Sequence, residues 1–168
     1  EFFGKGYNQE ISDESLSSYF SNFDSLEEYI EVAKEKLSYR GLLRSRVRYT
    51  SKLNEIGNGW ISGQGSAAPS DRVSEYSANI IRSLPHLILS NTVKILPELI
   101  VGPIPSGGVT FELHLDEDVF VRKILNTGHV FFESSIGDEL KEERTTRDEL
   151  LGKVDMFLKD VINYDRAG

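Results

Sequence analysis

The sequence contains no cysteine in its 168 residues. Disulfide bonds and catalysis by a thiol nucleophile are therefore excluded, and a chain without cysteine suits the reducing cytoplasm. Long hydrophobic runs are missing too, since every apolar run is far shorter than the roughly 20 residues that cross a bilayer. We expect a cytoplasmic protein that does not enter a membrane.

Catalytic and metal-binding motifs are also lacking. No serine lies in a Gly-x-Ser-x-Gly pattern, and His86, His114 and His129 do not show the short spacing of helical metal ligands. His114 and His129 would meet only across a curved sheet. Glu112 or Glu133 would then complete a metal cluster, but histidines that face solvent are the simpler interpretation. The sequence therefore predicts no catalytic residue, no metal site and no cofactor.

The charge is negative overall but unevenly distributed. A net charge of −8 argues against general nucleic-acid binding, which depends on neutralising phosphates. Residues 1–33 are strongly acidic, whereas residues 40–52 contain four arginines and one lysine but no acid. Two interpretations remain open: solvated faces that pair with each other, or a basic surface for an acidic partner or RNA. Arg44, Arg46 and Arg48 are the candidate partner-binding residues of this stretch.

The centre of the chain predicts an antiparallel meander. Three apolar runs are divided by turn signals, and we expect strands at 109–115, 119–125 and 129–135 that pair in sequence order. Strict alternation in the first run assigns one set of side chains to the core and the other to water. The core set is Val109, Phe111, Leu113 and Leu115. Residues 98–104 are a candidate fourth strand at the edge, so the sequence predicts an α+β fold with a three- or four-stranded antiparallel sheet.

Glycines mark the turns of this meander. Gly107 and Gly108 end an extended Pro-x-Pro segment whose prolines cannot donate a ladder hydrogen bond. We interpret both glycines as structural anchors. The Asn-Thr-Gly sequence at 126–128 is typical of a three-residue hairpin loop, with glycine where the backbone takes a positive φ.

Helix signals precede the meander. A capping-box pattern at Asp24 and Glu27 introduces apolar residues at helical spacing, and Gly41 is the expected stop of that helix. Residues 42–56 fit either a helix or a strand. We favour the helix, because residues 52–55, Lys-Leu-Asn-Glu, continue it without β-branching.

Two further helices are expected. Ser70 is the predicted cap of one helix, and Pro85 is its predicted end. Thr146 and Glu149 form a second capping-box pattern before an amphipathic helix at about 146–163. The apolar stripe of this last helix needs a surface, either the sheet of the same chain or a partner, and we favour the same chain.

A glycine-rich loop at 57–69 surrounds Trp60, the only tryptophan. The loop lacks the Lys-Ser/Thr pair of a phosphate-binding loop, and no clear strand precedes it, so phosphate binding is the weaker interpretation. The favoured interpretation is structural: Trp60 anchors the loop on the core, with its indole N–H bonded to a carbonyl. An exposed, ligand-binding tryptophan is the alternative.

Residues 59–69 read Gly-Trp-Ile-Ser-Gly-Gln-Gly-Ser-Ala-Ala-Pro, and residues 103–113 read Pro-Ile-Pro-Ser-Gly-Gly-Val-Thr-Phe-Glu-Leu. Together they resemble small bacterial and phage proteins of unassigned function, which carry a Gly-Trp-Asp-Gly-x-Gly-Ala-x-x-Pro loop and a Pro-x-Pro-x-Gly-Gly-Val-x-Leu/Phe-Glu-Trp strand. The loop Asp is absent here, and Leu113 replaces the strand tryptophan. The resemblance implies a compact α+β module, sometimes encoded in mobile or defence-type neighbourhoods, and implies no activity.

These features favour a non-enzymatic protein-interaction module, such as an inhibitor or accessory subunit in a bacterial or phage defence, counter-defence or toxin–antitoxin setting. We expect a protein partner of unknown identity, with a homodimer as the alternative. Phe2, Phe3 and Tyr7 in an N-terminal arm join the arginines as candidate partner-binding residues. The second hypothesis is a small nucleotide-binding protein or enzyme that uses the 57–69 loop, and the third is a phage assembly component.

The domain organisation is expected to be simple. We divide the chain into an N-terminal arm and helical segment at 1–56, an α+β core at 57–135, and an acidic linker with a C-terminal helix at 136–168. A chain of this length forms one compact domain with a sizeable core.

Overall fold

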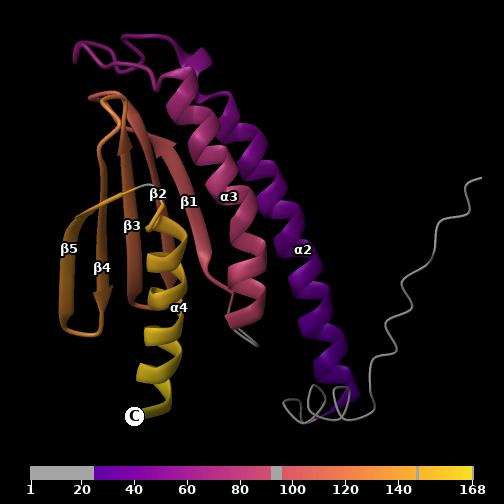
Figure 1. Ribbon diagram of the computed structural model, residues 1–168. Coiled ribbons are helices and arrows are strands. Elements are labelled where there is room, and N and C mark those ends of the chain that lie inside the picture. The colour runs from indigo at the N-terminus through magenta and orange to yellow at the C-terminus, as the bar shows by residue number, and fades with distance from the viewer. Residues whose placement is uncertain (1–24, 92–95, 147, 168) are drawn as a thin grey trace, which may run out of the picture.

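The structure, a computed structural model, describes residues 25–91, 96–146 and 148–167 (Figure 1). These residues form an α+β fold of helices and one antiparallel sheet, as predicted. In chain order the elements are α2 Leu26–Ser51, the short 3-10 helix η1 Leu53–Ile56, α3 Asp71–Asn91, β1 Glu98–Pro103, β2 Gly108–Leu115, β3 Asp118–Leu125, β4 Val130–Ile136, β5 Glu139–Thr145 and α4 Leu150–Ala167. No helix in the described ranges is both long enough and apolar enough to cross a membrane.

The sheet has the strand order β1-β2-β3-β4-β5, and every neighbouring pair is antiparallel. Phe111 lies opposite Arg122, which in turn lies opposite Phe132. The predicted meander and its edge strand at 98–104 are therefore confirmed.

A fifth strand corrects the predicted three- or four-stranded sheet. β5 lies in the segment that the sequence predicts as an acidic linker, and all of its residues except Thr145 are exposed. Charged residues suit an edge strand, because they discourage a further strand from pairing with its free side. A strand that is open to solvent on both faces has no apolar alternation, so the sequence pattern does not reveal it.

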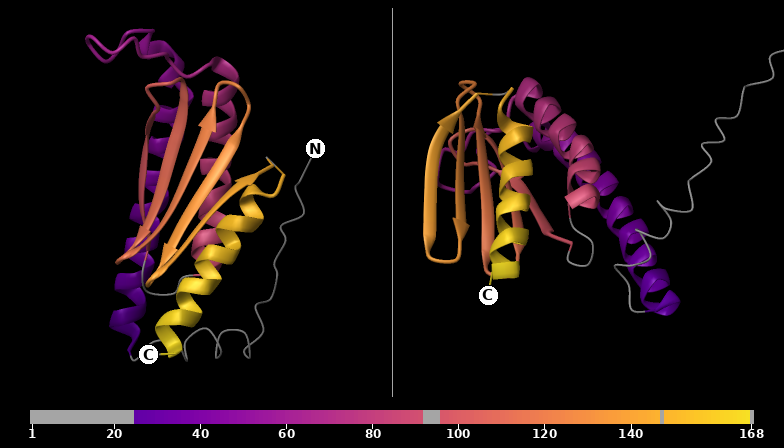
Figure 2. Two further views of the ribbon diagram at one scale, coloured as in Figure 1. Left: turned by 90° about the vertical axis from the view of Figure 1, so that its left-hand side faces the viewer. Right: turned by 60° about the horizontal axis from the view of Figure 1, so that its bottom comes forward.

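The three α-helices of the described residues lie on one face of the sheet. α3 packs on β2 and β3, α4 packs on β3 and β4, and α2 packs on α3 and touches the sheet at β1. The covered face carries the predicted core set of β2: Val109, Phe111, Leu113 and Leu115, all buried. The opposite face is not covered by any of the described helices (Figure 2, left).

α2 is a single helix of 26 residues that runs straight through Gly41, the predicted stop. Tyr39 and Leu43 flank this glycine and are both buried. Burying them outweighs the helix penalty of glycine, which is about 1 kcal/mol. The helix favoured for 42–56 is confirmed as far as Ser51, after which the chain tightens into η1.

The start of α2 differs from the predicted capping box. Asp24 lies outside the described residues, and Ser25 is the cap: its side chain accepts a hydrogen bond from the Glu28 N–H at 3.1 Å. Glu27 and Glu28 then lie in the first turn, where acidic residues stabilise a helix.

α3 begins as predicted but does not end as predicted. The Ser70 Oγ accepts a hydrogen bond from the Val73 N–H at 3.3 Å and caps the helix. Pro85 lies inside the helix, which continues past it. Leu84 and Ile88 on either side of the proline are fully buried, so their packing outweighs the lost helical hydrogen bond.

α4 completes the core, as favoured from its apolar stripe. Its buried residues are Leu150, Val154, Phe157, Leu158 and Val161. Leu151, assigned to the same stripe, is 36% exposed. The helix begins at Leu150, later than predicted, and the Glu149 Oε2 accepts a hydrogen bond from the Thr146 N–H at 3.3 Å. This bond is the glutamate half of the predicted capping box.

Candidate functional site

Three arginines line a cleft between α2 and α3, which we call the arginine cleft. Arg40, Arg44 and Arg82 surround it, and its volume is about 200 Å³. Arg40 and Arg44 are one turn apart on α2, so their side chains are neighbours. Arg82 reaches the same place because α3 runs back along α2 in the opposite direction (Figure 1).

The arginine cleft combines positive charge with an apolar floor. The floor consists of Leu43, Val47, Ile81 and Pro85. Among the described residues no carboxylate forms an ion pair with the three arginines, although Arg82 donates a hydrogen bond to the Asn79 side chain of its own helix. Like charges that converge without a counter-ion repel each other, so an anionic group is favoured here.

The three arginines predicted to bind a partner have different surroundings in the structure. Arg44 lines the cleft, and Arg48 is exposed one turn further along α2. Arg46 is half-buried, and its Nε atom is buried without a partner. Sequence reasoning misses Arg40, although its i,i+4 spacing from Arg44 is a signal. It also misses Arg82. No local pattern in the sequence indicates this residue, because only the packing of α3 against α2 brings it near Arg40 and Arg44.

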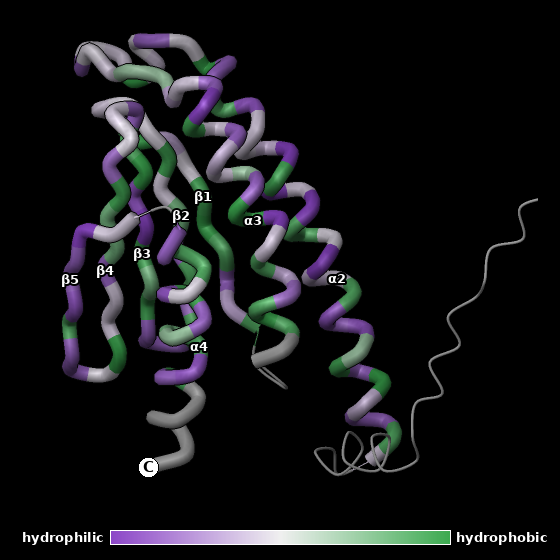
Figure 3. Tube along the Cα trace, viewed as in Figure 1, coloured by the Kyte–Doolittle hydropathy of each residue, from purple (hydrophilic) through white to green (hydrophobic). Residues whose placement is uncertain are grey.

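An apolar strip extends from the arginine cleft towards the N-terminus of α2. We define the strip as Leu26, Ile30 and Leu37, which are 65%, 42% and 69% exposed. Spacings of four and seven residues place these side chains on one side of the helix, and Arg44 follows on that side seven residues later. The N-terminal end of α2 extends beyond the end of α3 (Figures 1 and 2), and hydrophobic residues recur along α2 (Figure 3).

Trp60 organises its own loop rather than the core. Its indole Nε1 donates to the Ala67 carbonyl at 3.1 Å, which confirms the predicted bond to a carbonyl. The side chain is half-buried, however, and it does not belong to the buried core. The reason is position, because the loop lies at the end of the α2–α3 hairpin, away from the covered face of the sheet (Figure 1).

The backbone of the same loop is partly hydrogen-bonded within the protein. Its N–H groups that donate within the protein are those of Gly59, Ile61, Gln64, Ala67 and Ala68. A phosphate-binding loop works by pointing unpaired N–H groups at the anion. These five groups are not available to an anion, and the loop also lacks the Lys-Ser/Thr pair that completes a phosphate site.

Gly107 and Gly108 lie where the sheet meets this loop. Gly107 has a φ of +90°, and a Cβ on it would lie 2.5 Å from the Asn126 Nδ2. A Cβ on Gly108 would collide with the backbone of β3. Asn126 in turn accepts a hydrogen bond from the Ser70 N–H at 2.8 Å and donates one to the Ala68 carbonyl at 2.9 Å. Both glycines therefore allow a close approach of three chain segments.

The histidines do not come together. His114 lies near the β2–β3 turn on the uncovered face, with its Nε2 2.8 Å from the Glu112 Oε2. His129 lies at the opposite end of the sheet, beside the β3–β4 turn. In the described part of the chain no three His, Asp or Glu side chains gather into a group that could hold a metal ion.

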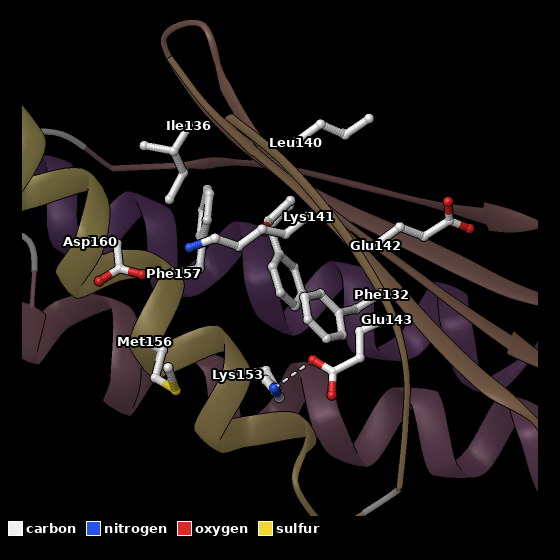
Figure 4. A pocket seen from close by; sticks show the side chains of 12 residues that line it. Phe132, Ile136, Leu140, Lys141, Glu142, Glu143, Lys153, Met156, Phe157 and Asp160 are labelled. Atoms are coloured by element: carbon white, nitrogen blue, oxygen red, sulfur yellow. Dashed lines mark hydrogen bonds and ion pairs between the residues drawn. The ribbon is translucent and has the colours of Figure 1, made fainter. Parts of the chain in front are cut away.

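A second cleft lies between β4, β5 and α4 (Figure 4), and we call it the aromatic cleft. Its volume is about 500 Å³, and Phe120, Phe132 and Phe157 form its floor. Lys153 on α4 pairs with Glu143 on β5 at 2.8 Å, and its Nζ lies 5.1 Å from the centre of the Phe132 ring. Aromatic side chains with a few polar groups are typical of small-molecule sites.

Arg122 lies buried beside this cleft, and the sequence analysis does not predict a role for it. Its side chain is 0% exposed, and its three nitrogens have no hydrogen-bond partner among the described residues. Burial lowers the pKa of the guanidinium to about 10, and Tyr76 acts in the opposite direction, so the group is charged at neutral pH. Burying an unpaired cation costs several kcal/mol. Such a residue needs an explanation beyond packing.

The remaining predicted binding residues, Phe2, Phe3 and Tyr7, lie outside the described residues. Comparisons of the chain with protein-family models, with curated proteins and with solved structures found no match. No relative therefore assigns a role to the arginine cleft or to the aromatic cleft.

Proposed function

We propose that the protein is a non-enzymatic binding module that captures an acidic, partly apolar segment of a partner protein on α2 and α3. The arginine cleft carries this proposal, because three guanidinium groups surround an apolar floor and form no ion pair within the described residues. Arginine suits such a surface, since its planar fork of donors matches a carboxylate.

The apolar strip favours a protein partner over a nucleic acid. Leu26, Ile30 and Leu37 are aliphatic, whereas single-stranded nucleic acids are held by aromatic side chains that stack on bases. The net charge of −8 also opposes a polyphosphate chain that would run beyond the cleft. An amphipathic helix with acidic residues beside its apolar face would match both the strip and the arginines.

The proposed setting is a bacterial or phage defence, counter-defence or toxin–antitoxin system, in which the protein acts as an inhibitor or accessory subunit. This setting rests on the resemblance of residues 59–69 and 103–113 to small bacterial and phage proteins. The absence of a catalytic motif from the sequence supports a binding role within it.

The test compares partners captured by matched variants. Affinity purification from a bacterial extract, followed by quantitative mass spectrometry, uses the wild-type protein and the double variant Arg44→Glu/Arg82→Glu. We expect at least one protein that the wild type retains and the cleft variant loses. The purified pair should then bind more weakly as salt is raised, because salt screens exposed charges.

A charge-matched control separates the cleft from the overall charge. Lys123→Glu/Lys159→Glu makes the same change in net charge at exposed sites on β3 and α4, so it should retain the partner. The proposal fails if the cleft variant keeps every wild-type partner, or if the control loses the same ones. Sedimentation equilibrium of the isolated wild type identifies the case in which a second copy of the chain occupies the surface.

The nucleotide hypothesis has its own discriminating measurement. A nucleotide present at 100-fold over its dissociation constant should stabilise the protein by about 2.7 kcal/mol. Thermal unfolding in the presence of nucleoside mono- and triphosphates should show no such shift, because the loop lacks the Lys-Ser/Thr pair of a phosphate-binding loop and five of its N–H groups bond within the protein.

A further inference from the structure

Arg122 presents five N–H donors that the described chain does not use. The guanidinium carbon lies 5.5 Å from the centre of the Phe120 ring and 5.4 Å from that of Phe132. Cation–π attraction offsets part of the lost hydration. The ring faces, however, do not provide hydrogen-bond acceptors for the five N–H donors, which lie in the plane of the guanidinium. The arrangement calls for an acceptor supplied from elsewhere.

The aromatic cleft lies next to this buried charge. Phe120 and Phe132, whose rings face the guanidinium, are also part of the floor of the cleft. One layer of side chains therefore separates Arg122 from the cleft. Arg122 does not itself line the cleft, so a ligand reaches it only if the Phe132 ring moves aside. Lys153, which pairs with Glu143, lies over the same ring.

The charges at the rim limit the ligand to a small one with a single acidic group. Glu142, Glu143 and Asp160 line the cleft together with Lys141 and Lys153, so the two lysines are outnumbered by acids and a nucleoside triphosphate or another polyanion is disfavoured. The volume of about 500 Å³ lies within the range of small-molecule pockets. The aromatic floor favours a ligand with an apolar body.

We propose that the aromatic cleft binds a small amphipathic monoanion, a carboxylate or sulfonate that carries an apolar body. The acidic group pairs with Arg122 and Lys153, and the apolar body packs against Phe157 and Met156 (Figure 4). Buried arginine is well suited to this role, because its charge-assisted hydrogen bonds are strongest where water is excluded. The site is separate from the arginine cleft and does not depend on the partner proposed there.

The first test uses anilinonaphthalene sulfonate, a fluorescent aromatic monoanion, with the native full-length chain. We expect saturable binding of one dye per chain. Octanoate should displace the dye, whereas octanol, which has the same body without the charge, should displace it poorly. Binding that does not saturate, or equal displacement by the alcohol, would overturn the proposal.

Variants then locate the acidic group. Arg122→Met keeps most of the side-chain volume and should raise the dissociation constant of the dye by about tenfold or more, since it removes a charge-assisted hydrogen bond. Lys159→Met removes a cation from the same helix as Lys153 but outside the cleft, so it should bind as the wild type does. A folded Arg122→Met protein with wild-type affinity would exclude the site.

A measurement on the wild type guards against misfolding of that variant. In an isotope-labelled sample the Arg122 Nε–H resonance reports directly on the guanidinium. Octanoate should shift this resonance in a saturable way and leave that of Arg48, on the exposed side of α2, unchanged. An Arg122 signal that does not respond to octanoate would refute the proposal whatever the variant does.

Discussion

The side-chain amide of Asn126 occupies the space into which a Cβ on Gly107 would project, with its Nδ2 2.5 Å from that position. The two residues also share a backbone hydrogen bond, because the Asn126 N–H donates to the Gly107 carbonyl at 3.0 Å. The Asn126 side chain also forms hydrogen bonds with the Ser70 N–H and the Ala68 carbonyl. One asparagine thus joins the β1–β2 loop, the β3–β4 turn and the start of α3.

Gly107→Ala should destabilise the protein more than Gly63→Ala. Both glycines have a positive φ, +90° and +78°, but nothing lies within 4 Å of a Cβ at Gly63. Gly63→Ala should therefore cost only the backbone strain of about 1–2 kcal/mol. Gly107→Ala should add about 0.5–1.5 kcal/mol, because it displaces the Asn126 amide from its hydrogen bonds to Ser70 and Ala68. Urea unfolding measures both, and equal losses would contradict the close approach.

Trp60→Ala should cost clearly less than the truncation of an aromatic residue in the core. Phe111 is 0% exposed, and Phe111→Ala should cost about 3–5 kcal/mol. Trp60 is half-buried and contacts its own loop, so we expect about 1–2 kcal/mol, near the middle of point-mutation effects. If the two variants lose the same stability in denaturant unfolding, Trp60 is a core residue after all.

Two substitutions on α4 distinguish a core helix from a detachable one. Phe157 is 3% exposed, and Phe157→Ala should cost about 3–5 kcal/mol. Leu151 lies on the outer side of the same helix, and Leu151→Ala should stay within about 0.5–1 kcal/mol of the wild type. Thermal unfolding provides the comparison. Small effects at both positions would mean that α4 is bound loosely.

Arg122→Met should leave the free energy of unfolding unchanged or raise it by about 1–4 kcal/mol, because it replaces an unpaired buried cation with an apolar chain of similar volume. Arg82→Met, at an exposed position, is the control and should change stability by about 0.5 kcal/mol or less. A loss of several kcal/mol in Arg122→Met would show that the folded chain already supplies an acceptor.

Glu149 should contribute to the acid sensitivity of the protein. Hydrogen bonds from the Thr146 N–H and the Thr145 hydroxyl lower the pKa of its carboxyl group below 4.5. A carboxyl group with a lowered pKa stabilises the folded state above its unfolded-state pKa and loses this contribution as the pH falls through the lowered value. Urea unfolding followed from neutral to acidic pH should therefore be less pH-dependent in Glu149→Gln.

Glu117→Gln serves as the control for that series. Glu117 is exposed in the β2–β3 turn and has no hydrogen bond or ion pair among the described residues, so its replacement should leave the pH dependence as in the wild type. Parallel pH profiles for all three proteins would contradict a role for the Glu149 hydrogen bonds.

The sequence predicts the fold correctly where a local pattern agrees with the tertiary packing. Alternation in 109–115 identifies the buried face of β2 because the sheet is covered on one side only. Ser70 caps α3 because the bond it makes is local. At Gly41 and Pro85 the local pattern and the packing disagree. Each residue on its own predicts the end of a helix, but buried neighbouring side chains keep the helix intact there.

The candidate sites depend on contacts that no local pattern encodes. Arg82 joins Arg44 only because two helices pair, and β5 escapes notice because charged residues at an exposed edge resemble a linker. Strict alternation in 119–125 would place Arg122 on the same face as Phe120. Because arginine side chains usually face water, the sequence does not predict that Arg122 is buried.

The strand order of the sheet is also the order in which a ribosome makes the strands. Every pairing closes a short loop, so each step of sheet formation costs little chain entropy, and growth can proceed hairpin by hairpin behind an already formed α2–α3 pair. α4 is the exception. It is made after the sheet, and until it docks, Phe120 and Phe132 remain uncovered. Docking of α4 therefore ends the exposure of these two rings, which until then offer chaperones an apolar surface.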